Sequence, residues 1–159
     1  MLEKAWFFKE VFRATDRSFR KKEREIITAG DGSMYSKNVL DQIGNTPIVC
    51  LKNILDADIF AKAEHLNPGG SIKDRVALFM LEEAKRSGEL KEGDIIAEPT
   101  SGNTGIGMAL VGGLMGHHVI VVMPENMSEE RKKIIRALGA ELILTPAKES
   151  IEGCIRVIR

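Results

Sequence analysis

The chain has 159 residues, of which 43% are hydrophobic and 29% charged, and its formal net charge is zero. This length suffices for one domain with a hydrophobic core but not for two ordinary ones. A zero net charge gives no whole-surface attraction to nucleic acid or to an anionic membrane, and no apolar run is long enough to cross a bilayer. Cys50 and Cys154 lack the spacing of a zinc or redox motif, so we expect reduced thiols in a cytoplasmic protein.

Residues 1–33 differ in character from the rest and are interpreted as an N-terminal extension. An apolar cluster between Trp6 and Phe12 precedes a run of mixed charges over 20–25, and 29–33 has the composition of a linker. We expect an amphipathic helix followed by that linker. Three functions remain open for it: partner docking, a nucleic-acid contact or an organelle presequence. The mixed charges disfavour the second, and the acidic residues disfavour the third.

From residue 34 to 159, strand and helix patterns alternate through the middle and end of the chain. Alternation of this kind predicts an α/β fold with an open, mostly parallel sheet and flanking helices. The last helix shows no stop signal before the chain ends, so we interpret the chain as truncated. In chain order we expect strands over 47–51 and 58–63, a helix opening at Ser71, a strand over 94–97, a helix over 103–115, a strand over 118–123, a helix after Ser128, a strand over 141–145 and a helix over 151–158.

The helix that follows Asn67-Pro68-Gly69-Gly70-Ser71 carries a lysine in its first turn. Ser71 is a good N-cap, and Asp74 completes a capping-box-like pair. Lys73 then lies at the positive end of the helix dipole, where a cation costs about 0.3–1 kcal/mol. A lysine amine at such a position is a candidate nucleophile toward carbonyl groups. A solvated surface lysine is an equally weighted alternative. The predicted apolar face of this helix comprises Ile72, Val76, Phe79 and Met80.

A second segment, Glu98-Pro99-Thr100-Ser101-Gly102-Asn103-Thr104-Gly105, joins a predicted strand to a predicted helix. Its small residues allow a ligand to approach the backbone, and the free amides of a helix N-terminus bind anions. The hydroxyls of Thr100, Ser101 and Thr104 add further donors. We favour an anion site here over a plain capped turn.

Other patterns give weaker signals. A dinucleotide fingerprint could begin at Gly105-Ile106-Gly107, with Glu125 at a suitable distance, but its sixth position is Leu110. A nucleotide-binding half-domain is therefore a weak alternative. His117 and His118 are adjacent in a predicted strand and should point to opposite sides, which suits a metal poorly.

Three motifs occur in the same order as in a known family. They are Ile43-Gly44-Asn45-Thr46-Pro47, the segment from Asn67 to Arg75, and the segment from Pro99 to Gly105. With them the chain resembles the cysteine synthase and cystathionine β-synthase branch of the fold-type II pyridoxal-phosphate enzymes. The resemblance covers roughly residues 34–159, which would form the N-terminal α/β part of a catalytic domain.

The resemblance implies a role for individual residues. Lys73 would hold pyridoxal 5'-phosphate as a Schiff base and then serve as acid and base at the substrate α-carbon. Asn103 would bind the 3′-oxygen of the cofactor. The residues implied in binding the substrate carboxylate are Thr100, Ser101, Gly102 and Thr104.

The reaction implied is a β-replacement that forms L-cysteine from O-acetylserine and sulfide, with a cystathionine β-synthase-type condensation as the weaker alternative. The family's later glycine-rich phosphate loop and late serine have no counterpart in this chain, so we expect the chain alone to be inactive or nearly so, with apolar faces exposed. A non-catalytic remnant or interaction protein is the competing function class. We further expect an amino-acid substrate, a homodimer when the enzyme is complete, and no metal, nucleic-acid or membrane partner.

Overall fold

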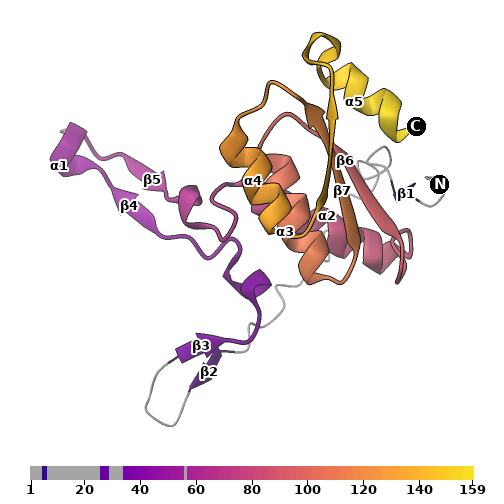
Figure 1. Ribbon diagram of the computed structural model, residues 1–159. Helices are drawn as coiled ribbons and strands as arrows, with labels where there is room; N and C mark the ends of the chain where they lie inside the picture. Colours follow the sequence, from indigo (N-terminus) through magenta and orange to yellow (C-terminus); the bar gives the residue numbers. More distant parts are fainter. Residues whose placement is uncertain (1–4, 7–25, 29–33, 56) are drawn as a thin grey trace.

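A parallel sheet with helices on both faces forms the body of the molecule (Figure 1). The computed structural model describes residues 5–6, 26–28, 34–55 and 57–159. In this part of the chain the main sheet has the strand order β1-β6-β7-β8, and every neighbouring pair is parallel. Its strands are β1 (Ala5–Trp6), β6 (Ile95–Pro99), β7 (His118–Pro124) and β8 (Glu141–Thr145). The predicted α/β fold with a mostly parallel sheet is confirmed.

Four helices of the described chain cover the two faces of the sheet, and two of them, α3 and α4, connect neighbouring parallel strands. Three of them pack on one face, and the C-terminal helix packs on the other. They are α2 (Lys73–Ser87), α3 (Asn103–Leu114), α4 (Glu129–Ala137) and, on the opposite face, α5 (Ser150–Ile158). Gly88 ends α2 with a φ of 79°, a conformation that costs glycine little. The Ser128 hydroxyl caps the start of α4 by accepting the Arg131 N–H at 3.4 Å.

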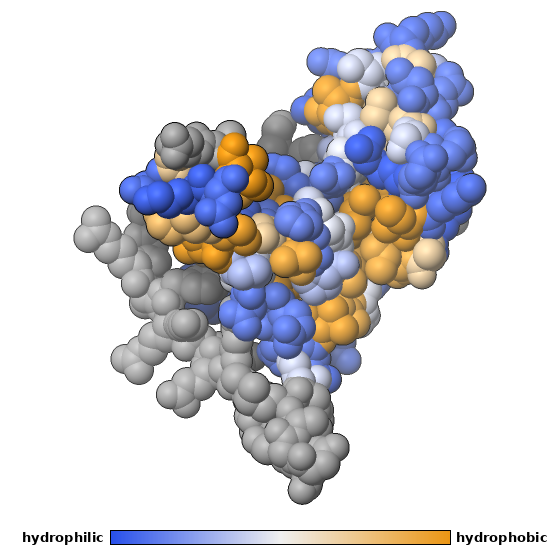
Figure 2. Space-filling model, turned by 90° about the vertical axis from the view of Figure 1, so that its left-hand side faces the viewer, coloured by the Kyte–Doolittle hydropathy of each residue, from blue (hydrophilic) through white to orange (hydrophobic). Residues whose placement is uncertain are grey.

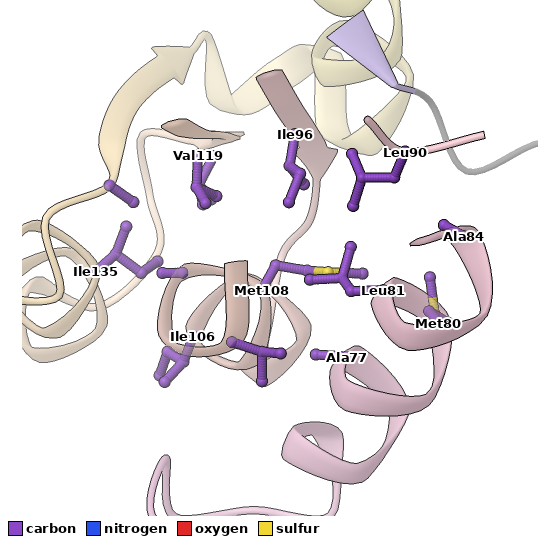
Figure 3. Packing of buried hydrophobic residues seen from close by; sticks show 14 of the residues in the cluster. Ala77, Met80, Leu81, Ala84, Leu90, Ile96, Ile106, Met108, Val119 and Ile135 are labelled. Atoms are coloured by element: carbon purple, nitrogen blue, oxygen red, sulfur yellow. The ribbon is translucent and has the colours of Figure 1, made fainter. Parts of the chain in front are cut away.

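The main core lies between the sheet and the pair α2 and α3. Figure 3 shows Leu81 and Met108 meeting between these helices below Ile96 of the sheet. A Cβ added to Gly112 would lie 2.7 Å from Val119 and 3.0 Å from Ile96, so α3 rests directly on the sheet. A second cluster on the other face comprises Ala97, Ile120, Val122, Cys154 and Ile158.

Two antiparallel ribbons lie outside the main sheet. β4 (Ile48–Cys50) pairs with β5 (Phe60–Lys62), and α1 (Lys52–Leu55) connects them. This arm stands away from the sheet in Figure 1. Its apolar side chains are largely exposed, with Phe60 at 66%, and hydrophobic patches are visible on this side of the molecule in Figure 2. The second ribbon pairs β2 (Ile26–Thr28) with β3 (Met34–Ser36).

The structure corrects two sequence expectations. The predicted apolar face of α2 is wrong at three positions, because Ile72, Val76 and Phe79 are 51%, 36% and 44% exposed. The face that includes Ala77 and Leu81 is buried instead, because the small Ala77 side chain permits close contact with α3. In the N-terminal extension, residues 5–6 form a strand rather than a helix, and the rest of the predicted helix lies outside the described residues.

Cys50 is exposed and Cys154 is buried, and both are free thiols. Among the helices that the structure describes, none combines the length and the hydropathy that a bilayer span requires.

Candidate functional site

Lys73 is the first residue of α2, as predicted, but the cap differs from the expectation. The N-cap is Ile72, and Ser71 contributes only its hydroxyl, which accepts the Lys73 N–H at 3.1 Å. Asp74 does not form the expected reciprocal pair with Ser71, because its carboxylate turns towards Gly69. The Lys73 side chain is half-buried, and the described residues offer its Nζ neither a hydrogen bond nor an ion pair.

Asp74 shapes the loop that precedes Lys73. Its side chain is fully buried, and Oδ2 accepts the Gly69 N–H at 2.5 Å, whereas Oδ1 has no partner in the described part of the chain. Burial raises the pKa of this carboxyl, and the Gly69 N–H offsets part of that effect. A Cβ on Gly69 would lie 2.5 Å from Asp74 Oδ1, so the loop can pass this carboxylate only at a glycine.

A polar cluster of Gly44, Glu64, Asn67 and Arg75, here called the polar clasp, joins two of the sequence motifs. Arg75 donates to both carboxylate oxygens of Glu64, at 2.8 and 2.9 Å, and to the Gly44 carbonyl at 2.9 Å. Asn67 accepts the Gly44 N–H at 2.8 Å and donates to Glu64. The Arg75 hydrogen bonds lower the pKa of Glu64 to about 2. The clasp therefore fixes both ends of the segment that leads to Lys73.

The segment from Pro99 to Gly105 forms the turn between β6 and α3. The Thr100 N–H donates to the Val122 carbonyl at 2.9 Å, and the Thr100 hydroxyl accepts the Gly102 N–H at 3.1 Å. Gly102 is the N-cap of α3, and a Cβ there would meet nothing within 4 Å. Ser101 and Asn103 are exposed at this turn. The turn is thus held from within by Thr100 and leaves open space above its backbone.

Close packing of α2 against α3 brings Lys73 to this turn. A Cβ on Gly107 would lie 2.9 Å from the Lys73 carbonyl oxygen and 3.3 Å from Ala77 Cβ, and one on Gly112 would meet Leu81 at 3.7 Å. The two helices therefore run in the same direction, and both N-termini lie at the carboxyl end of the sheet, where parallel sheets bind ligands. The positive ends of two helix dipoles converge there.

The structure thus places the predicted site residues at one end of the molecule. Lys73 opens α2, Thr100 and Ser101 follow β6, Gly102 is the N-cap of α3, and Asn103 and Thr104 are its first two residues. By contrast, the glycines of the dinucleotide alternative lie inside α3, where Gly105 packs on Thr100 and Gly107 on Lys73. They serve helix packing rather than a phosphate turn. The residues of this group are Lys73, Thr100, Ser101, Gly102, Asn103 and Thr104.

Two residues near the turn were missed from the sequence. Glu98 is only 7% exposed, and burial raises the pKa of its carboxyl to about 7. Arg131 of α4 donates from Nη1 to the Ser101 carbonyl at 3.3 Å. A lone carboxylate in the otherwise apolar strand Ile95–Pro99 was the available signal for Glu98. No local pattern indicates Arg131, because α4 reaches the turn only through the tertiary fold.

The histidines behave as expected for adjacent strand residues with opposite orientations. His117 is buried with Nδ1 3.0 Å from the Asp94 carbonyl oxygen, and His118 is exposed with Nε2 3.2 Å from Glu141. Across the described ranges, no group of three or more His, Cys, Asp or Glu side chains is arranged to hold a metal ion.

Comparison with curated proteins finds relatives over the same part of the chain. A cysteine synthase of Staphylococcus aureus is 52% identical over 122 residues, which are 75% of this chain and 39% of that protein. A cystathionine beta-synthase of Mus musculus is 52% identical over 121 residues, which are 73% of this chain and 22% of that protein. The chain therefore spans about two-fifths of the bacterial relative's length and less of the mouse relative's.

Solved structures with the same fold include the same two kinds of enzyme as these relatives. A cysteine synthase from Entamoeba histolytica superimposes with a TM-score of 0.74 at 39% identity, over 86% of this chain and 42% of that one. An O-acetylserine dependent cystathionine beta-synthase from Helicobacter pylori superimposes with a TM-score of 0.71 at 42% identity, over 79% of this chain and 43% of that one. The model of the family described as "Pyridoxal-phosphate dependent enzyme" matches residues 39–159. The resemblance seen in the sequence is confirmed, and the chain belongs to the pyridoxal-phosphate-dependent enzymes.

Proposed function

We propose that this chain provides the cofactor lysine and the amino-acid carboxylate site of a cysteine synthase-like β-replacement, in which sulfide displaces the β-substituent of O-acetylserine. The observation that carries the proposal is the placement of Lys73 and the turn at 99–105 together at the carboxyl end of the sheet. An amine and an anion site at the same end of the sheet suit the amino and carboxylate groups of an α-amino acid substrate.

The residues present fit the family's cofactor at its aldehyde side. The Lys73 amine is half-buried at a helix N-terminus and has no hydrogen-bond or ion-pair partner in the described ranges, so it is available to an aldehyde. Asn103 is exposed in the first turn of α3 and would bind a ring oxygen. When bound, pyridoxal phosphate supplies an electron sink for cleavage at the substrate α-carbon.

The chain's own residues would then bind the substrate and move its proton. The hydroxyls of Ser101 and Thr104 and the free amides at the start of α3 would bind the carboxylate, helped by the helix dipole. Thr100 would act mainly by holding the turn, because its hydroxyl already accepts the Gly102 N–H. Lys73 Nζ would take the proton from the substrate α-carbon and return it later.

A chimera tests this proposal, because the chain matches only part of its relatives. Residues 39–159 would replace the matching residues of the Staphylococcus aureus cysteine synthase. We expect the chimera to form L-cysteine from O-acetylserine and sulfide, and Lys73→Ala to abolish this reaction. A folded chimera, verified by circular dichroism, that binds pyridoxal phosphate but forms no cysteine would contradict the proposal.

The equal identity to the mouse cystathionine beta-synthase supports a second candidate, condensation with a larger thiol. The same chimera decides between the two when homocysteine replaces sulfide. Faster product formation with homocysteine would favour the condensation.

A further inference from the structure

Glu98 points from β6 towards α3, beneath the turn at 99–105. Its register partner in the sheet is Val121, and Val121 faces α3, since a Cβ on Gly105 would lie 3.1 Å from Val121 Cγ1. Ile96, two residues earlier in β6, also faces α3, because a Cβ on Gly112 would meet it at 3.0 Å. Side chains alternate along a strand, so Glu98 shares this buried face with Ile96.

The Glu98 carboxyl is buried, and among the described residues neither a hydrogen bond nor an opposite charge replaces its lost hydration. Burial is the sole cause that raises its pKa, to about 7, and neither a hydrogen bond nor a neighbouring charge opposes it. A buried carboxylate without a partner is costly, and such groups in otherwise apolar layers indicate a functional role.

No charged group among the described residues contributes to the raised pKa of Glu98. α3 and β1 contain no ionisable residue, and α5 lies on the opposite face of the sheet. His118 lies at the other end of β7 and is exposed. In the described part of the chain, the ionisable residues of the neighbouring elements are His118 of β7, Glu152, Cys154 and Arg156 of α5, and Lys73, Asp74, Arg75, Glu82, Glu83, Lys85 and Arg86 of α2. Arg131 of α4 also reaches the turn, through the Ser101 carbonyl.

We propose that Glu98 takes up a proton when a carboxylate binds at the turn 99–105, so that carboxylate recognition by this turn is linked to pH. The inference rests on the proposed function of that turn. Thr100 lies two residues beyond Glu98, roughly 7 Å along the strand. A carboxylate bound just above it would repel an ionised Glu98 through a poorly solvated layer and would favour the protonated form.

Carbon-13 NMR of carboxyl-labelled glutamate in the whole chain tests this inference, with Glu98→Gln to assign the resonance. L-alanine is the probe, and L-alaninamide, which lacks the carboxylate, is its matched control. We expect the Glu98 titration midpoint to rise by roughly one pH unit with saturating L-alanine and to stay unchanged with L-alaninamide. By reciprocity, the affinity for L-alanine should fall roughly tenfold between pH 6 and pH 8.5.

Variants complete the test. In Glu98→Gln the affinity for L-alanine should no longer depend on pH, whereas Glu130→Gln, an exposed carboxylate of α4, should keep the dependence. If L-alanine shifts the Ser101 and Asn103 amide resonances but leaves the Glu98 midpoint in place, the proton linkage is wrong and the anion site stands. If no resonance responds to L-alanine, the anion site itself is wrong, and the linkage fails with it.

Discussion

Two ionisable side chains have unusual positions: Glu98 lies in surroundings that disfavour its charged form, and Lys73 stands at a helix N-terminus. Lys73 begins a helix, where the dipole opposes a cation, and Glu98 lies in an apolar layer. The packing of the fold does not require a carboxyl group at position 98, since an apolar residue would fill the same buried space. Because such placements reduce stability, their presence at one end of the sheet supports a functional rather than a structural role.

Glu98 should make the stability of the chain fall as pH rises. Its pKa is about 7 in the folded chain and 4.5 ordinarily, a difference that corresponds to about 3 kcal/mol. Between these values the folded chain binds the proton that the unfolded chain has lost, so stability decreases through this window. Urea unfolding should show Glu98→Gln more stable than the wild type by up to about 3 kcal/mol at pH 8 and equal to it near pH 4.5. Identical pH profiles would contradict the assignment.

Glu64 should have the opposite pH dependence. Arg75 holds its pKa at about 2, so the stability that the pair contributes is present above pH 4.5 and is lost as pH falls towards 2. Glu64→Gln should therefore lower the melting temperature at pH 7, and the difference from the wild type should vanish near pH 2. Glu92→Gln, an exposed carboxylate outside the clasp, is the control and should change little. If Glu64→Gln still has a lower melting temperature than the wild type at pH 2, the ion pair is not the cause of the difference.

At the scale of elements, local signals predicted most helices and strands but not how they pair. The predicted bounds of β8 match the structure, and Gly88 and Ser128 correctly marked the end of α2 and the start of α4. The buried face of α2 was not predicted, because both of its faces carry apolar residues and the choice depends on Gly107 of α3. Likewise, β4 and β5 were predicted as strands, but nothing local indicates that they pair with each other outside the main sheet.

The residues of the candidate site also fall into two groups, those that the sequence indicated and those that only the structure revealed. Lys73 could be selected from sequence because it lies at a predicted helix start, and Asn103 was indicated by the family resemblance. Glu98 and Arg131 could not, since burial and the approach of α4 are tertiary properties. The polar clasp explains why the motif at 43–47 accompanies the lysine motif, through the contacts of Gly44 with Asn67 and Arg75.

The contact between α2 and α3 is sensitive to one glycine. In Gly107→Ala the new Cβ would lie 2.9 Å from the Lys73 carbonyl oxygen, so α2 must shift. We expect a loss of about 1–3 kcal/mol in the free energy of unfolding and weaker pyridoxal phosphate binding. Gly113→Ala, in the same helix, meets only Leu138 at 3.6 Å and should be neutral or stabilising by up to about 1 kcal/mol. Equal effects of the two substitutions would contradict the proposed packing role of Gly107.

At the scale of the whole molecule, the sheet carries the candidate site and the arm leaves apolar surface uncovered. Ile54 and Phe60 of the arm and Ile72 of the loop before α2 are more than half exposed. The chain spans about two-fifths of the bacterial cysteine synthase it matches, so catalysis by the complete enzyme remains a proposal that rests on Lys73.

Covalent capture of the cofactor at Lys73 is the most direct test. The purified chain would be mixed with equimolar pyridoxal phosphate, reduced with borohydride, digested and mapped by mass spectrometry. We predict one labelled peptide, containing Lys73, whose label is lost in Lys73→Ala and kept in Lys85→Ala, a substitution of an exposed lysine at the other end of the same helix. Label spread over several surface lysines, or label that persists in Lys73→Ala, would contradict the assignment.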